Sequence, residues 1–254
     1  MNENGVGASS LRKEDDRHLR GRGKFVGDIQ PAGTRHIAFL RSPVAHGYLR
    51  SVSIPTAYRD QVFVASDLQA VTPIRAGSSL PGFKPSDQPV LVHDKIRHVG
   101  ELIAMCIGKS RADAEDLVDE LEFEFEELPA IVDMLKARKR NSPLVHDEWI
   151  DNVYLESSWQ GDAFDKKDVT ATVTREFRTN RQCMAPIEGR GVIAYRDNRL
   201  DQLVIYSSTQ MPHIVRTGLA ECLGLDHARI RVISPDVGGG FGYKGILADR
   251  KSVV

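Results

Sequence analysis

Apolar and polar positions alternate along several short stretches of the chain, and this period of two predicts β-strands. Three stretches of strand character come early, at residues 36–42, 51–54 and 61–66, of which 51–54 alternates strictly. Pro43 closes the first of them, because proline cannot donate a ladder hydrogen bond. Residues 72–89 hold four prolines and two glycines, so we expect an irregular loop there.

The clearest pattern in the first half lies between residues 98 and 128. An apolar run at 98–108 predicts a buried strand, and 110–121 predicts a helix with Ser110 as its N-cap. Residues 122–128 alternate apolar and acidic side chains, which indicates a strand with one wet face. Together they predict a β–α–β unit within an α+β domain.

The second half of the chain predicts further regular elements. These are strands at 169–177 and 228–237, two strands joined by a turn within 191–210, and a helix at 211–224. The turn is expected at Arg196–Arg199. Gly224 is expected to end the helix, because glycine accepts the left-handed conformation that helix ends often need.

Composition and charge narrow the function classes. The chain has 34 basic and 35 acidic residues, so its net charge of −1 gives no electrostatic case for nucleic acid or anionic membranes. The first 25 residues lack the apolar core of a secretory signal, and no apolar run approaches membrane-spanning length. Three widely spaced cysteines argue against a disulfide framework, a zinc knuckle or an iron–sulfur cluster, and favour a reducing cytoplasm.

The stretch SPDVGGGFGYKG, residues 234–245, is the strongest candidate for chemistry. From Gly240 to Gly245 it matches the dinucleotide fingerprint G-x-G-x-x-G. However, that fingerprint also needs a following helix and an acidic residue about 20 positions on, and neither is visible. A P-loop is excluded because Tyr243 stands where glycine is required. The remaining alternative from the residues alone is a tight turn whose glycines allow close backbone packing.

Two other motifs accompany this glycine loop, CMAPIEGRG at 183–191 and SSTQMPH at 207–213. In this order and spacing the three motifs resemble the molybdenum-binding subunit of the xanthine dehydrogenase and aldehyde oxidase family, which includes aerobic carbon monoxide dehydrogenase large chains. Residues 21–53 and 97–133 look like that family's small hammerhead domain. The resemblance implies an α+β fold, with a hammerhead-like domain followed by the first part of a molybdopterin-binding domain.

The resemblance also divides the chain. The expected divisions are a flexible arm at 1–19, the hammerhead-like domain at 20–135, a linker at 136–150, the N-terminal part of the molybdopterin-binding domain at 151–248, and a non-native tail at 249–254. The family's subunit is longer, and the pattern breaks just after the glycine loop. We therefore expect a truncated reading frame, with a naturally split subunit as the rival explanation.

Cofactor contacts follow from the resemblance residue by residue. The family's glutamine after Ser-Thr donates to an oxo ligand of molybdenum, and here it is Gln210. The family's glycine loop lies on the molybdopterin, and here its residues are Gly239, Gly240, Phe241 and Gly242. These are cofactor contacts, and no side chain of this chain is expected to ligate the metal directly. Backbone amides suit phosphate and oxo oxygens, which supports the assignment.

Other candidates have plainer interpretations. Glu188 and Arg190 are interpreted as a buried acidic–basic pair or a turn support in preference to a catalytic role. His46 is interpreted as a structural hydrogen bonder, whereas His213 is equally compatible with the cofactor pocket and with a first-turn helix position. Cys106 is interpreted as an inert core thiol in a buried strand. Cys183 and Cys222 have no basic partner in sequence and are not nominated as nucleophiles.

The implied function is that of a molybdenum hydroxylase that oxidises an aldehyde, an N-heterocycle or carbon monoxide, with water as the oxygen source. Its cofactor would be molybdenum–molybdopterin, with the cytosine dinucleotide form as one candidate. FAD and [2Fe-2S] clusters are expected on partner subunits. Gly245 replaces a glutamate of some purine-oxidising members, which weakens a purine-specific role. The family's catalytic base lies outside this chain, so we expect the isolated chain to be inactive. The alternative is a non-catalytic fragment or assembly module of such a complex.

Overall fold

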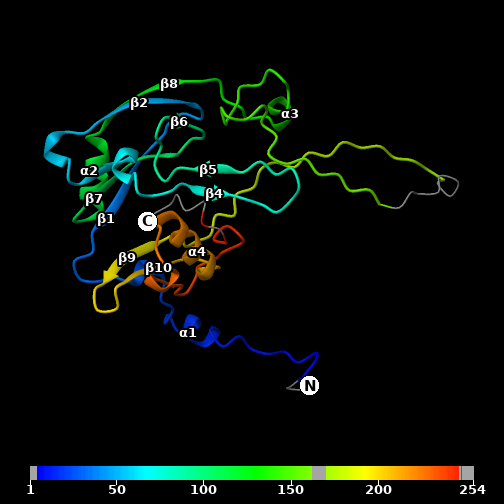
Figure 1. Cartoon of the computed structure of the whole chain (residues 1–254). Coiled ribbons are helices and arrows are strands. Elements are labelled where there is room, and N and C mark those ends of the chain that lie inside the picture. Colours follow the sequence, from blue (N-terminus) through cyan, green and yellow to red (C-terminus); the bar gives the residue numbers. More distant parts are fainter. Residues whose placement is uncertain (1–4, 162–169, 246, 248–254) are drawn as a thin grey trace. The chain divides into compact units, whose positions relative to one another are not determined.

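The computed structural model describes residues 5–161, 170–245 and 247, and the chain divides into two compact units. Unit 1 combines residues 1–36 with 186–254, and unit 2 holds residues 37–185. Figure 1 follows the chain from its blue N-terminal segment through both units. Unit 1 carries all three motifs except the first residues of CMAPIEGRG, so it is the unit that positions the candidate site.

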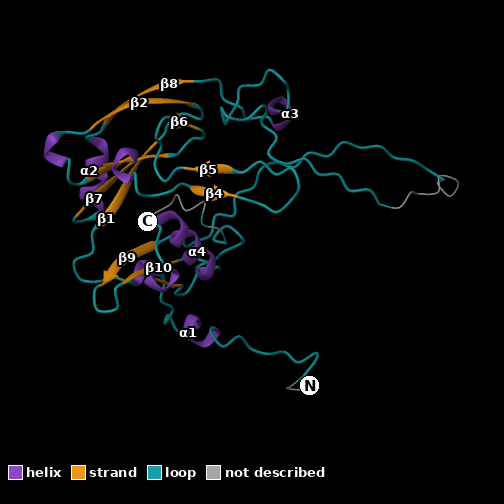
Figure 2. Cartoon of the chain, viewed as in Figure 1, coloured by secondary structure: helices purple, strands orange, loops and turns teal. Residues whose placement is uncertain are grey.

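Unit 2 is built from small sheets with short helices (Figure 2). One sheet has the order β1-β7-β3, formed by His36–Arg41, Leu102–Gly108 and Val62–Val64. A second has the order β6-β2-β8, formed by Lys95–Ile96, Gly47–Ser53 and Glu122–Glu127. A third pairs β4 with β5, which are Ile74–Ala76 and Ser86–Gln88.

Helix α2, Arg111–Asp119, confirms the helix predicted at 110–121. Ser110 accepts a hydrogen bond from the Asp113 N–H at 3.1 Å, and the Asp113 carboxylate accepts one from the Ser110 N–H at 3.0 Å. This reciprocal capping box satisfies two N–H groups at the start of the helix. The helix buries Leu117 in a core that includes Val62 and Ile103. The strand predictions for β1, β2, β3 and β7 are confirmed within this unit.

Two predictions for unit 2 are wrong in their arrangement. Strands β7 and β8 flank α2 but lie in different sheets, so they form no β–α–β unit within one sheet. Hydrogen bonding decides this, because β8 pairs antiparallel with β2. The segment 72–89 is not wholly irregular, since its two ends pair as the β4–β5 hairpin.

The strand predicted at 169–177 is also wrong over the residues that the structure describes, 170–177, which have no strand. Val173 and Phe177 are 79% and 86% exposed. A strand needs a neighbour for its backbone groups and an apolar surface for one face. The described part of the chain gives this stretch neither, so the alternating pattern alone is insufficient. Residue 169 lies outside the described residues, as does the tail expected at 249–254.

Unit 1 contains a three-stranded sheet of order β11-β10-β9. Its elements are β9 (Val192–Asp197), β10 (Gln202–Ser207), α4 (Pro212–Leu223) and β11 (Ile230–Ile233). β9 and β10 form an antiparallel hairpin, and α4 crosses over to bring β11 parallel to β10. The helix packs on the sheet through Ala220, against Ile205 and Ile230. The hairpin and the helix are confirmed, including Gly224, which ends α4 with a left-handed φ of 63°. The strand predicted at 228–237 is confirmed only over Ile230–Ile233.

The remaining elements are short. They are the α-helices α1 (Asp15–Leu19) and α3 (Met134–Ala137), and the 3₁₀ helices at Val26–Asp28, Thr56–Tyr58, Ala65–Leu68 and His227–Arg229. Within the described ranges, none of the helices has the length and apolar character required to cross a membrane.

Burial separates the three thiols into two classes. Cys183 is exposed, whereas Cys106 and Cys222 are buried. Burial raises the pKa of Cys106 to about 11, and burial together with Glu221 raises the pKa of Cys222. At pH 8 the Cys106 thiolate is therefore about one part in a thousand of the total.

We expect a thiol reagent such as dithionitrobenzoate at pH 8 to modify one cysteine per native chain quickly. The other two should react only after a denaturant is added, because the thiolate is the reacting form and both sites are closed to reagent. The Cys183→Ser variant is the control and should lose the fast phase. A fast phase that persists in this variant would contradict the assignment.

Candidate functional site

The part of the glycine motif from 237 to 245, called the glycine loop from here on, is separated by three residues from β11, which ends at Ile233. One carboxylate fastens it at both ends. Oε2 of Glu188 accepts a hydrogen bond from the Gly238 N–H at 2.7 Å and from the Lys244 ammonium at 2.8 Å. The Glu188 N–H in turn donates to the Gly238 carbonyl at 3.2 Å. Lys244 is 1% exposed, so this is a buried ion pair. Its effect is to fix the start and the end of the loop relative to each other.

Arg190 holds the same end of the loop from a second direction. It is buried, it donates to the Tyr243 carbonyl, and its guanidinium lies 3.7 Å from the centre of the Tyr243 ring. A buried acidic–basic pair therefore exists, but Glu188 pairs with Lys244 and Arg190 stacks on Tyr243. Glu188 and Arg190 therefore do not pair with each other, and the alternative interpretation as a turn support agrees with the bond that each makes to the loop. Nothing in the local sequence indicates Lys244, which lies 56 positions downstream of Glu188.

The SSTQ segment that follows β10 ties the loop to the rest of unit 1. The Thr209 hydroxyl and the Gln210 N–H both donate to the Lys244 carbonyl, each at 3.1 Å. The Ser208 hydroxyl donates to the Gly189 carbonyl at 3.2 Å. Ser207, Ser208 and Thr209 are all buried, so their polar groups are used inside the protein. These bonds thus fix the position of the Gln210 backbone, from which its side chain extends.

The Gln210 side chain is fixed in orientation by the glycine loop itself. Its Oε1 accepts a hydrogen bond from the Gly242 N–H at 3.0 Å. Gln210 is exposed, and its Nε2 donates to none of the residues that the structure describes. Since the carboxamide oxygen is engaged, the amide donor is the group left for a ligand. The role predicted for Gln210, donation to an oxygen of the cofactor, needs this group and stays a prediction.

Three successive N–H groups of the loop are also left for a ligand. The amides of Gly239, Gly240 and Phe241 donate no hydrogen bond to any residue in the described part of the chain. Gly239, Phe241 and Gly242 have positive φ angles of 98°, 50° and 79°. Turns of alternating handedness make concave groups of amides that bind anionic oxygens.

The loop lies so close to Gln210 that any residue larger than glycine at position 240 requires the loop or the Gln210 side chain to move. A Cβ on Gly240 would come within 2.3 Å of the Gln210 Cδ. Phe241 is 68% exposed, so its ring is available to a ligand. The donors in this region are neutral amides, which suit the phosphate and oxo oxygens of a molybdopterin cofactor. Among the described residues no cluster of three or more histidine, cysteine or acidic side chains could hold a metal. The residues therefore fit a cofactor held through its oxygens.

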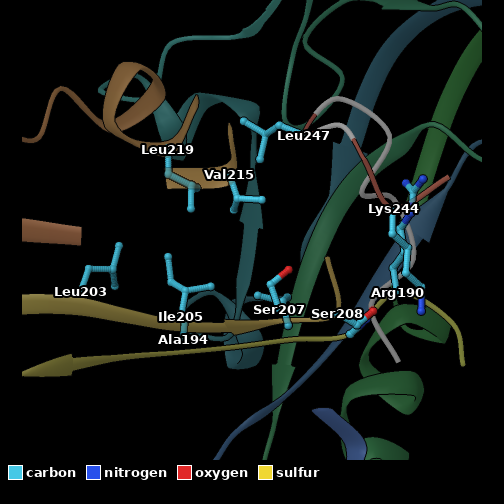
Figure 3. Close-up of a pocket in the computed structure, with 12 residues that line it drawn as sticks. Arg190, Ala194, Leu203, Ile205, Ser207, Ser208, Val215, Leu219, Lys244 and Leu247 are labelled. Atoms are coloured by element: carbon cyan, nitrogen blue, oxygen red, sulfur yellow. The ribbon is translucent and has the colours of Figure 1, made fainter. Parts of the chain in front are cut away.

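A cavity of about 220 Å³ lies behind the loop, between the sheet and α4 (Figure 3). Its walls are apolar, with Leu203, Ile205, Val215 and Leu219 along the sheet and helix, as Figure 3 shows. Arg190 and Lys244 lie at its other end in the same view. The apolar wall of the cavity therefore ends at Arg190 and Lys244, the two cations that hold the loop.

Asp236 is a site residue that the sequence reasoning missed. It stands just before the loop, and its side chain is 9% exposed. Arg17, on α1, donates to both of its carboxylate oxygens, and the Lys24 N–H donates to Oδ2 at 2.8 Å. These bonds, the one from Arg17 foremost, hold the pKa of Asp236 well below its ordinary range. The structure thus gives contacts to Arg17, which lies in the segment 1–19 that the sequence predicted to be a flexible arm, and to Lys24 just beyond it.

The two candidate histidines lie apart from the loop contacts. His46 is buried in unit 2, where its Nδ1 lies 2.9 Å from the Pro129 carbonyl, in agreement with a structural role. His213 is exposed at the start of α4 and lines a separate pocket with Arg216 and Arg231.

Two family models and several known proteins match this chain. Residues 20–129 match the family described as aldehyde oxidase and xanthine dehydrogenase, a/b hammerhead domain, and residues 145–251 match the molybdopterin cofactor-binding domain. The chain is 35% identical to the nicotine 6-hydroxylase large subunit of Paenarthrobacter nicotinovorans, over 96% of this chain and 31% of that protein. It is 28% identical to the carbon monoxide dehydrogenase large chain of Hydrogenophaga pseudoflava, over 94% of this chain and 32% of that protein.

Among solved structures, quinoline 2-oxidoreductase from Pseudomonas putida 86 superposes with a TM-score of 0.87 at 34% identity. The match covers 94% of this chain and 31% of that one. The chain thus spans about a third of the length of the relatives that it matches. Both relatives named above are large subunits or chains by name.

Proposed function

Because this chain belongs to the aldehyde oxidase and xanthine dehydrogenase family of molybdenum-binding subunits, we propose that it forms the first part of a cofactor site in a molybdenum hydroxylase. The observation that carries the proposal is the set of unengaged donors, namely the amides of Gly239, Gly240 and Phe241 beside the oriented carboxamide of Gln210. Four donors gathered at one loop are what an oxygen-rich, anionic cofactor requires.

In this proposal each residue has a defined task. The amides of the loop bind oxygens of the molybdopterin, Gln210 donates from Nε2 to an oxygen of the cofactor, and Phe241 excludes water beside it. The bound cofactor supplies two-electron oxidation of the substrate with an oxygen atom that comes from water. Glu188 and Lys244 keep the loop closed on itself, and the catalytic base belongs to a part of the protein outside this chain.

The proposed substrate class is small molecules that such enzymes oxidise, an aldehyde, an N-heterocycle or carbon monoxide. Names of relatives support this range, since they include a nicotine hydroxylase, a quinoline oxidoreductase and a carbon monoxide dehydrogenase. We further propose a cytoplasmic complex with an FAD-binding subunit and an iron–sulfur subunit, and the cytosine dinucleotide form of the cofactor. The isolated chain is then inactive.

The test of this proposal is the molybdenum and pterin content of the protein, purified with its partner subunits from cells that make the cofactor. Molybdenum is measured by mass spectrometry, and pterin by the fluorescence of its acid-released oxidation product. We expect both in equal amounts with the chain. A protein that contains neither would contradict the proposal and favour an assembly module.

The Gly240→Ala variant makes the test specific to the loop. Its Cβ would lie 2.3 Å from the Gln210 Cδ, so the loop backbone and the Gln210 side chain must move apart. This shifts the three amide donors of the loop, and we expect at least about a tenfold loss of bound pterin. Gly27→Ala is the matched control, because its Cβ meets nothing within 4 Å and it lies in the same unit. Equal pterin content in Gly240→Ala and Gly27→Ala would exclude the loop as the binding site.

A further inference from the structure

The segment from Arg17 to Val26 is bound to the residue that leads into the glycine loop, although about 210 positions separate them in sequence. Arg17 makes a two-pronged contact with the Asp236 carboxylate, and the His18 Nε2 lies 3.4 Å from Oδ1. Planar guanidinium–carboxylate pairs of this kind fix direction as well as distance. Asp236 is therefore held in one orientation by α1.

The backbone of Lys24 completes the connection in both directions. Its N–H donates to the Asp236 carboxylate at 2.8 Å, and its carbonyl accepts from the Asp236 N–H at 3.0 Å. Two residues farther along the same segment, Val26 is 5% exposed and packs against Gly191, where a Cβ would come within 2.9 Å of the Val26 Cγ1. The segment is thus fixed by an ion pair, by backbone hydrogen bonds and by packing.

Only Val237 separates Asp236 from Gly238, which Glu188 holds. The amides of Gly239 to Phe241 follow at once, so two successive anchors determine where these donors start. We propose that Asp236 is a positioning residue for the cofactor loop, which it links to the N-terminal segment 17–26. The role in cofactor binding rests on the proposed function. The structural link between the segment 17–26 and the glycine loop is a property of this chain alone.

The coupling is tested by hydrogen–deuterium exchange on the full chain without cofactor, followed by mass spectrometry of a peptide that covers the glycine loop. Asp236→Asn and Arg17→Ala should each raise the exchange rate of the hydrogen-bonded loop amides, those of Gly238 and residues 242–245, about tenfold or more. The reason is that each variant removes a charge-assisted pair that holds the start of the loop. The matched controls are Asp16→Asn and Arg20→Ala, which break an exposed ion pair within the same N-terminal segment. These controls should leave loop exchange unchanged.

A second readout separates positioning from general stability. In both Asp236→Asn and Arg17→Ala, a peptide from β10 should exchange as in the unaltered chain, since it lies in the same unit but outside the linkage. The double variant should exchange like either single variant, because the two residues act through one contact. Unchanged loop exchange, equal rises in the loop and β10, or fully additive effects would each overturn the proposal.

The link between Asp236 and cofactor binding is tested by a separate measurement, whose result distinguishes failure of the positioning role from failure of the proposed function. In the complex with its partner subunits, the pterin content of the Asp236→Asn variant should be lower than that of the Asp16→Asn variant by about tenfold or more. If the unaltered complex holds no pterin, the proposed function fails while the exchange result stands. If the complex holds pterin and Asp236→Asn retains it fully, the positioning role fails and the proposed function stands.

Discussion

Replacing Lys244 by methionine is expected to lower the free energy of unfolding of unit 1 by about 3–5 kcal/mol. Lys244 is fully buried and supplies the cation for Glu188, whose side chain is 18% exposed. Without that cation the carboxylate keeps one hydrogen bond from Gly238, and its Oε1 is buried with no partner among the described residues. Leaving one charge of a buried pair uncompensated costs far more than the pair contributes when it is intact.

The chain has two units, so each must be followed by its own probe. Exchange of a β10 peptide across a urea series reports unit 1, and a β7 peptide reports unit 2. The double variant Lys244→Met with Glu188→Gln should recover most of the loss, because no unpaired charge remains. Arg196→Met breaks an exposed pair with Asp201 and should cost less than about 1 kcal/mol. A cost this small for Lys244→Met would refute the argument.

Replacing Gln210 by leucine is expected to lower the turnover of the assembled protein by about 10²–10³-fold while molybdenum and pterin remain bound. The reason is geometric. Oε1 is fixed by the Gly242 N–H, so Nε2 is a preoriented donor, and leucine has similar volume but no donor. The three loop amides remain to hold the cofactor.

Turnover is measured on whichever aldehyde, N-heterocycle or carbon monoxide the unaltered complex oxidises, with a dye as electron acceptor. The paramagnetic resonance spectrum of the dithionite-reduced complex gives a substrate-independent readout and should change in Gln210→Leu. The control is Gln202→Leu, whose amide donates to the Ala228 carbonyl away from the loop. Similar turnover and spectra for both variants would show that Gln210 does not contact the cofactor.

Local signals in the sequence predicted the elements that depend on local chemistry. The hairpin within 191–210, the helix after Pro212 and its end at Gly224 follow from turn residues, capping and helical period, and all are confirmed. Predictions failed where pairing between distant segments decides the structure. The alternating pattern at 170–177 could not reveal that the described part of the chain offers this stretch no neighbouring strand. Likewise, the strand–helix–strand order within 98–128 could not reveal that β7 and β8 join different sheets.

The candidate site shows the same division. Gln210 and the glycine loop were named from motifs, and the structure adds the bond between Gln210 and Gly242 that relates them. Lys244 and Asp236 escaped notice because their partners are 56 and 219 residues away, at Glu188 and Arg17. No periodicity or capping rule connects side chains at such separations, since their meeting depends on the packing of the whole unit.

The division of the chain means that unit 2 is inserted into unit 1. Residues up to His36 belong with residues from Pro186 onward, so unit 1 is complete only when both have been made. During synthesis, Lys24 leaves the ribosome long before Asp236 exists, a delay of roughly ten to forty seconds at ordinary translation rates. Unit 2 can fold within that interval, and closing it first shortens the loop that unit 1 must later bridge. Asp236, just before the glycine loop, thus makes its contacts with the N-terminal segment only after the whole of unit 2 has been synthesised.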